Sequence, residues 1–170
     1  MELDHVLICT SVGAPEAARL ADLGLTEGAS NTHPGQGTSN RRFFFRNVYL
    51  ELLWVHDEVE ARSEQVYPTR LWERWSGRGN GVCSIGFSFR PDESQMAEPS
   101  FLCWQYRPSY LPEPLCMHIG SNVDLLTEPM LCYLDFAQRP DRYPPGKTSA
   151  YGPCGWPFRN YARCVSHPSR

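Results

Sequence analysis

The chain has 170 residues, a length that suits one well-packed domain or two small repeated units that share a core. Hydrophobic residues make up 41% and charged residues 21%, and the formal net charge of -3 excludes a general attraction to nucleic acid or to an anionic membrane surface. The sequence has neither an apolar run of about 18 residues nor a secretory signal pattern, so we expect a cytoplasmic protein without a membrane span.

The first half of the chain predicts, in order, a strand at 3–10, a helix at 14–24, a weak strand at 25–29, a loop at 31–40 and a hairpin at 41–55. Pro15 suits the first turn of the helix and Gly24 its end. The loop is rich in Gly, Asn and Pro, so its His33 is expected at the surface. The hairpin turns at Arg46-Asn47, where Asn tolerates a positive φ.

The second half repeats these signals without a clear helix between its first two strands. Its segments are a polar linker at 57–66, a short helix at 68–75, and strands at 81–90, 101–108, 116–122 and 128–136. We therefore expect one domain over 1–136, divided into a first module at 1–56, a linker helix at 57–80 and a second module at 81–136. The Pro- and Gly-rich residues 137–170 predict an irregular tail.

The seven cysteines are expected to be reduced. None lies in a CxxC pair, and five fall inside apolar runs, where a free thiol behaves as a small hydrophobe: Cys9, Cys83, Cys103, Cys116 and Cys132. A disulfide framework would suit a shorter, secreted, turn-rich chain.

Two ionisable residues stand inside apolar strands. His5 shares a strand face with Leu7, and Glu51 shares one with Leu53. A carboxylate in such a run is costly unless it is paired or bound to a metal ion. We therefore expect His5 and Glu51 to face each other across a cleft, close enough to share a hydrogen bond, an ion or a water molecule. Taken singly, a histidine or a glutamate in such a position is more often structural than functional.

Further residues are candidates for the wall of a ligand pocket: Arg42, Ser84, Trp104, Tyr106 and Arg107. Ser84 begins a row of small side chains on one strand face, which leaves room either for a ligand or for a close helix contact. Trp104 and Tyr106 share a face and can stack on a flat ligand or form ordinary aromatic core. Arg42 and Arg107 are candidate anion-binding groups.

The segments LDHVLIC, HPGQGTSNRRFFFRNVYLELLWV, WQYRPSYLPEPLCMHIG and EPMLCYL resemble the glyoxalase-like group of the vicinal oxygen chelate superfamily over roughly residues 3–136. The resemblance implies an α+β fold, in which tandem βαβββ modules form a curled mixed sheet around a cleft. Many members hold a divalent metal ion there, with one ligand from the first and one from the last strand of each module. His5 and Glu51 match the two positions of the first module, and they are also the catalytic candidates.

The second module departs from this pattern. Ser84 stands opposite His5, and Cys132 falls roughly at the fourth position, so the usual four ligands are not present. His118 can supply a third ligand beside His5 and Glu51, a set that suits Zn, Fe, Mn or Ni; the alternative is that no metal is bound.

Three functions therefore remain open: a structural or interaction module with a vestigial cleft, and two functions that involve a small-molecule ligand. One is a metal-dependent lyase, isomerase or dioxygenase that acts on a small oxygenated substrate, in which the metal polarises oxygens and His5 or Glu51 moves a proton. The other is a metal-free ligand-binding or drug-sequestering protein without catalytic activity. The resemblance also implies a homodimer, and neither nucleic acid nor membrane is an expected partner.

Overall fold

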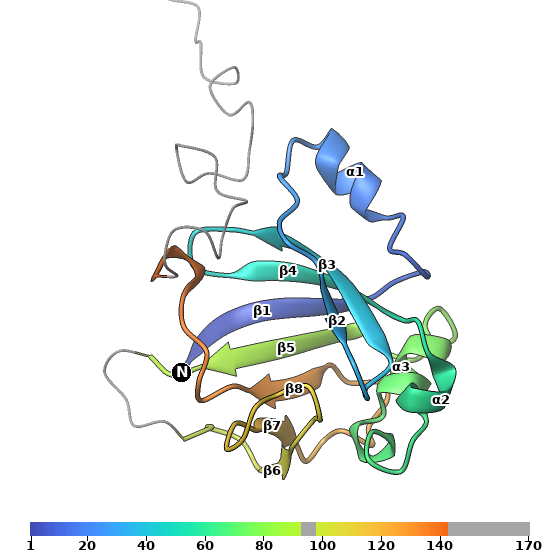
Figure 1. Ribbon diagram of the computed structural model, residues 1–170, viewed down its shortest axis with the longest axis vertical. Helices are drawn as coiled ribbons and strands as arrows, with labels where there is room; N and C mark the ends of the chain where they lie inside the picture. Colours follow the sequence, from blue (N-terminus) through green and yellow to red (C-terminus); the bar gives the residue numbers. More distant parts are fainter. Residues whose placement is uncertain (93–97, 143–170) are drawn as a thin grey trace, which may run out of the picture.

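The computed structural model describes residues 1–92 and 98–142. Across these ranges eight strands form one mixed sheet in the order β2-β3-β4-β1-β5-β8-β7-β6 (Figure 1). The strands are β1 (Glu2–Cys9), β2 (Asn31–His33), β3 (Thr38–Phe44), β4 (Tyr49–Val55), β5 (Ile85–Arg90), β6 (Cys103–Tyr106), β7 (Met117–Gly120) and β8 (Met130–Tyr133).

The helices are short. They are α1 (Ala17–Asp22), α2 (Glu58–Ala61) and α3 (Leu71–Ser76), with 3-10 turns at Tyr67–Thr69 and Pro140–Arg142. Figure 1 shows α1 beside the first half of the sheet, and α2 and α3 together at one end of it. None of the helices in the described ranges has the length and apolar composition needed to cross a membrane.

The sheet consists of two halves with the same internal pairing. In the first half β1 runs parallel to β4, and in the second half β5 runs parallel to β8. The antiparallel pair β1–β5 joins the halves. The described residues between β5 and β6, 91–92 and 98–102, contain no helix, whereas α1 separates β1 and β2. The expected α+β fold with tandem βαβββ-like units around a curled mixed sheet is confirmed.

Each face of the first half packs into a different core. Leu52 of β4 packs with Phe43 of β3 against Ala17 of α1. The next residue, Leu53, points to the other face and packs with residues of the second half, among them Ile119 of β7. This alternation follows from the two-residue period of a strand, and it leaves the inner face, which carries Leu53, free to enclose a cavity.

The segment 25–40 differs from the sequence-based expectation. The weak strand at 25–29 is reduced to one bridge between Glu27 and Phe43. The expected loop at 31–40 instead contains the hairpin β2–β3. Its pairing is reinforced by side chains, because Asn31 N donates to Asn40 Oδ1 over 2.7 Å. Polar cross-strand bonds therefore hold a strand pair that the composition alone does not indicate.

The linker and the start of the tail also differ from the expected elements. The polar part of the linker is helical at α2, and the helix expected at 68–75 begins only at Leu71, because Arg70 adopts φ +55 and interrupts the turn before it. Most of the expected tail, 143–170, lies outside the described residues. Its first six residues include the 3-10 turn at Pro140–Arg142.

Gly37 joins the β2–β3 turn to α2. It has φ +72, and a Cβ at this position would lie 2.2 Å from the carbonyl oxygen of Asp57 and 2.7 Å from Ala61 N. The close approach lets the Gly37 carbonyl accept hydrogen bonds from the backbone N–H groups of His56 (2.9 Å) and Asp57 (3.1 Å). Gly37 N donates to Glu60 Oε2 over 3.0 Å. Only glycine fits both the conformation and the contact.

We predict that Gly37→Ala lowers the free energy of unfolding by about 3 kcal/mol or more, because it adds backbone strain and a steric clash. Gly79→Ala is the matched control: Gly79 has φ +82 but open space around its Cβ position, so the cost is the strain alone, about 1–2 kcal/mol. Urea denaturation of both variants gives the comparison. Equal losses would contradict the close-contact argument.

Candidate functional site

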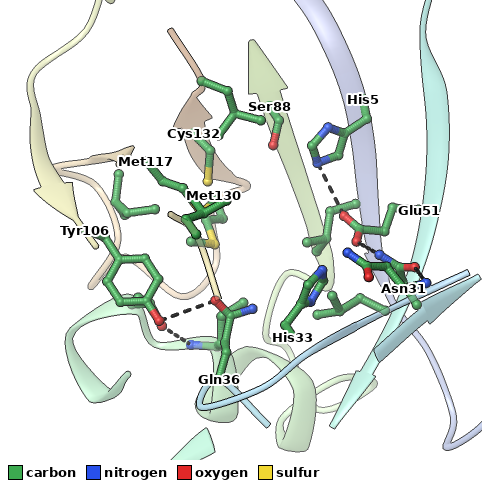
Figure 2. Close-up of a pocket in the computed structure, with 18 of the residues that line it drawn as sticks. His5, Asn31, His33, Gln36, Glu51, Ser88, Tyr106, Met117, Met130 and Cys132 are labelled. Atoms are coloured by element: carbon green, nitrogen blue, oxygen red, sulfur yellow. Dashed lines mark hydrogen bonds and ion pairs between the residues drawn. The ribbon is translucent and has the colours of Figure 1, made fainter. Parts of the chain in front are cut away.

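A cavity of about 210 Å³ lies between the inner face of the sheet and the loops that cover it. Its polar side chains come mainly from the first half of the chain and include His5, His33, Asn40 and Glu51. The second half supplies mainly apolar and aromatic side chains: Tyr106, Tyr110, Leu111, Met117, Ile119, Met130, Leu134 and Phe136. Figure 2 shows this division, with Glu51 and His5 on one side and Met117, Met130 and Tyr106 on the other.

The structure brings His5 and Glu51 together. His5 Nε2 lies 3.3 Å from Glu51 Oε2, and both side chains are about 5% exposed. The two residues lie on the neighbouring parallel strands β1 and β4, so they share one wall and do not face each other across the cleft as expected. Asn40 of β3 donates a hydrogen bond from Nδ2 to Glu51 Oε1. Both oxygens of the buried carboxylate are thus occupied.

Asp4 completes the environment of His5. Strand alternation places Asp4 and His5 on opposite faces, yet Asp4 Oδ2 lies 2.7 Å from His5 Nδ1. The register between β1 and β5 shifts between Leu3 and His5, so Asp4 is an extra residue in the β1–β5 ladder. Such a bulge changes the direction of a side chain. It lets Asp4 reach His5 along its own strand.

Arg90 of β5 holds Asp4 from the other side. Its Nη1 donates to Asp4 Oδ1 over 3.0 Å, and its Nη2 donates to Glu2 Oε2 over 2.9 Å and to the Asn47 carbonyl over 2.7 Å. Arg90 is 1% exposed. A buried charge is tolerated when it is paired and hydrogen-bonded. Arg90, Asp4, His5 and Glu51 therefore form a buried chain of alternating charge.

The chain of charges shifts the pKa values of its members. Burial opposes the charged form of His5, but the hydrogen bond that its Nδ1 donates to Asp4 and the interaction with Glu51 outweigh it and raise the pKa of His5 to about 9. Burial likewise opposes ionisation of Glu51, but the neighbouring His5 and the Asn40 amide lower its pKa to about 2. At neutral pH the pair is imidazolium and carboxylate.

The donor set does not fit the four-ligand metal site that the resemblance implies. On β5 and β8 the cavity wall carries Ser88, Met130 and Cys132. Burial raises the pKa of Cys132 to about 12, so the residue is a thiol, and only the thiolate is a good ligand. Both ring nitrogens of His5 are engaged by carboxylates, Nδ1 by Asp4 and Nε2 by Glu51.

His118 does not join the other two expected ligands. Its neighbours along β7 line the cavity, so His118 points to the opposite face of the sheet. There its Nδ1 lies 3.9 Å from Cys103 Sγ and its Nε2 lies 3.7 Å from Asp135 Oδ2. Within residues 1–92 and 98–142, no three His, Cys, Asp or Glu side chains are placed to hold a metal ion together. The expected set of His5, Glu51 and His118 is not assembled.

Two of the five expected pocket residues line the cavity. Arg42 lies at its rim, where Nε donates to the Ala29 carbonyl over 2.7 Å and the guanidinium lies 5.2 Å from the centre of the Phe44 ring. Tyr106 lies inside the cavity, with its hydroxyl donating to Gln36 Oε1 over 3.3 Å. Burial raises the pKa of Tyr106 to about 12, so the phenol stays protonated.

The other three lie elsewhere. Ser84 precedes β5, and its carbonyl accepts a hydrogen bond from Cys9 N over 2.8 Å. Trp104 packs against the core beside the cavity, and Arg107 is exposed. On β5 the small residue that reaches the cavity is Ser88, which pairs directly with His5 in the register.

His33 is the main site residue that the sequence did not indicate. It is 8% exposed rather than at the surface, and its ring stacks on Tyr110 with centroids 4.7 Å apart. Ser109 Oγ donates to the Pro34 carbonyl over 2.9 Å, so the loop before β7 closes over the β2–β3 turn. A usable signal was the Pro34-Gly35 turn between two Thr-containing segments, which is typical of a hairpin.

The pKa shifts of His5 and Glu51 predict how stability depends on pH. The pKa of His5 is raised from 6.5 to about 9, so between these values the folded chain holds more protons than the unfolded chain. The stabilisation is therefore complete below pH 6.5 and is lost as the pH rises through about 9. We expect the free energy of unfolding to fall by about 2 kcal/mol between pH 6.5 and pH 8.5. For Glu51 the stabilisation is present above pH 4.5 and is lost as the pH falls towards 2.

Urea denaturation across this range tests the pH dependence. His5→Gln should remove the slope between pH 6.5 and pH 8.5, whereas His56→Gln, at an exposed position, should leave it unchanged. A wild-type curve no steeper than that of His5→Gln would refute the assignment.

We predict that Arg90→Leu lowers the free energy of unfolding by about 3–5 kcal/mol, because it leaves the buried Asp4 carboxylate without its cation. Arg46→Leu is the control: the Arg46 side chain is 80% exposed and lies 3.5 Å from Asp141, so we expect a change below about 0.5 kcal/mol. Chemical denaturation at pH 7 measures both. Similar small losses would show that the buried chain of charges does not stabilise the fold.

Comparison with known proteins gives the family. No curated protein matches the chain. The crystal structure of methylmalonyl-CoA epimerase from Mycobacterium tuberculosis is similar, with a TM-score of 0.45 and 13% sequence identity over 80% of this chain and 88% of that chain. The model of the glyoxalase-like domain family matches residues 3–103, which is more than half of the chain. The chain therefore belongs to the glyoxalase-like domain family, as its resemblance to the vicinal oxygen chelate superfamily predicts.

Proposed function

We propose that this chain binds a small, largely apolar molecule in the cavity between its two halves, and that binding does not depend on a metal ion. The observation that carries the proposal is the division of the cavity wall into one polar end, at His5, His33 and Glu51, and a surrounding apolar wall. Small-molecule sites typically combine an apolar lining with a few polar groups that fix orientation.

The size of the cavity supports a ligand of about one ring. An apolar cavity of about 150 Å³ is enough to bind benzene, and this one measures about 210 Å³. The loop that carries Tyr110 and Leu111 contributes to the lining. A larger ligand would have to displace this loop, which is tied to Pro34 through Ser109.

The state of the acid–base pair favours binding over proton transfer. An efficient general acid or base has a pKa near the working pH. The pKa of His5 is raised to about 9 and the pKa of Glu51 is lowered to about 2, because each residue stabilises the charged form of the other. In this state the carboxylate is a weak base, and its oxygens are engaged by His5 and Asn40.

A second candidate function is a proton-transfer enzyme, an isomerase or lyase that uses Glu51 as base and His5 as acid. The observation in its favour is that both groups line the cavity. A ligand that separated them would shift both pKa values back towards neutrality. The metal ion, the homodimer and the cytoplasmic location expected from the sequence stay predictions.

We predict that ethylbenzene, as an apolar probe of one ring, binds the wild-type chain. Leu134 follows β8 directly and lines the cavity, so Leu134→Trp fills the cavity and should weaken binding at least tenfold, because the probe loses its space. The control is Leu102→Trp, at a residue that is 84% exposed, which should bind the probe like the wild type. Isothermal titration or NMR titration gives the affinities.

Metal content and the effect of EDTA test whether binding is independent of a metal ion. Protein purified without a histidine tag should carry well below one equivalent of Zn, Fe, Mn or Ni, and EDTA should leave ethylbenzene binding unchanged. One equivalent of metal that depends on His5 and Glu51, or loss of binding in EDTA, would refute it and favour the metal-dependent enzyme.

A further inference from the structure

A directed chain of hydrogen bonds crosses the cavity from the second half to the first. Tyr106 of β6 donates to Gln36 Oε1 over 3.3 Å, and Gln36 Nε2 donates to Thr38 Oγ1 over 2.8 Å. Thr38 Oγ1 lies 2.9 Å from His33 Nδ1. His33 and Thr38 are a directly paired couple of the β2–β3 hairpin. The four side chains that make these hydrogen bonds are 8% exposed or less.

The chain of bonds determines which ring nitrogen of His33 carries the hydrogen. Thr38 is fully buried, and among the described residues its hydroxyl has two partners, Gln36 Nε2 and His33 Nδ1. The amide nitrogen of Gln36 only donates, so of the two partners His33 Nδ1 is the one that can accept the hydroxyl hydrogen of Thr38, and a buried hydroxyl hydrogen is rarely left without an acceptor. Neutral imidazole has one N–H. That hydrogen is therefore on Nε2.

The surroundings of His33 keep the ring neutral. Burial lowers the pKa of His33, and although Glu51 acts against this, the charges of Arg42 and His5 lower the pKa further. The ring lines the cavity, and Figure 2 shows it projecting between Gln36 and Glu51. Within the described residues, the hydrogen bond of the His33 ring is made by Nδ1. Its Nε2–H is a donor that a ligand can use.

We propose that His33 Nε2–H binds the carbonyl oxygen of an uncharged ligand, so that the site selects small ketones or similar carbonyl compounds with an apolar body. This inference rests on the proposed binding function and names its ligand class. A neutral donor in a mainly apolar cavity favours a polar acceptor over a hydrocarbon of the same shape, because that acceptor recovers the hydrogen bond it loses in water.

The charges around the cavity argue against an anionic ligand. The Glu51 carboxylate is ionised in the same wall, and the imidazolium of His5 already neutralises it. Arg42, the cation at the rim, is held by the Ala29 carbonyl and lies over the Phe44 ring. A ligand carboxylate would thus lose its hydration beside a like charge without gaining a dedicated cation.

Three probes of one ring test the proposal: acetophenone, ethylbenzene and benzoate. In a cavity without a donor, ethylbenzene binds more tightly than acetophenone, because the carbonyl loses its hydration. We expect the wild type to prefer acetophenone and to bind benzoate most weakly. His33→Phe should shift the acetophenone-to-ethylbenzene affinity ratio about tenfold towards ethylbenzene. His56→Phe, at an exposed histidine, is the control and should keep the wild-type ratio.

The outcomes distinguish the role of His33 from the binding function itself. Equal ratios in the wild type and His33→Phe, or tighter binding of benzoate than of acetophenone, would overturn the role of His33 while leaving the binding function intact. Failure of both neutral probes to bind would overturn both. If His33→Phe does not fold, the imidazole ¹⁵N–¹H spectrum of the wild type decides: a hydrogen on Nε2 of His33 supports the proposal, and a hydrogen on Nδ1 overturns it.

Discussion

Charge balance inside the sheet is the constraint on which the site depends. Arg90, Asp4, His5 and Glu51 are all 5% exposed or less, and each contacts a neighbour of opposite charge. Four charges in an apolar interior are tolerated only in such an alternating series. Because the four residues come from β5, β1 and β4, which are adjacent in the sheet, the series also fixes how these strands align. The floor of the cavity is therefore rigid where its polar groups lie.

The two halves of the sheet share a topology but not a chemistry. The first half places ionisable and amide side chains around the cavity, whereas at matching strands the second half places Ser88, Met130 and Cys132. A symmetric fold has room for metal ligands from both halves, but among the residues that line the cavity only those of the first half are ionised. Fold alone does not decide function. The asymmetry of the donor set is what favours binding of an apolar molecule over metal chemistry.

The roof of the cavity links the halves through polar contacts of loops. Tyr106 reaches Gln36, and Ser109 reaches Pro34, so the second half is tied to the β2–β3 turn at two points. Glycine at position 35 allows the approach of Ser109, because a Cβ at Gly35 would lie 2.0 Å from Ser109 Oγ. The turn holds His33 over the polar end of the floor. A ligand bound as proposed would therefore contact both halves at once.

The sequence by itself determined seven of the eight strands in outline, with β2 as the exception, together with the hairpin turning near Asn47, the helix of the first half and the proximity of His5 to Glu51. These follow from local periodicity and from the cost of placing two ionisable groups in apolar strands. The structure, and not the sequence, showed that His118 points away from the cavity, since its neighbours on β7 line it. Only the tertiary structure decided that Asp4 turns to His5, that Arg90 reaches Asp4, and that His33 is buried. The turn of Asp4 towards His5 needs a bulge in the β1–β5 register, and the contact of Arg90 with Asp4 joins residues that are 86 positions apart. The burial of His33 needs the loop of the second half that carries Ser109 and Tyr110. No local sequence pattern encodes such contacts between distant segments.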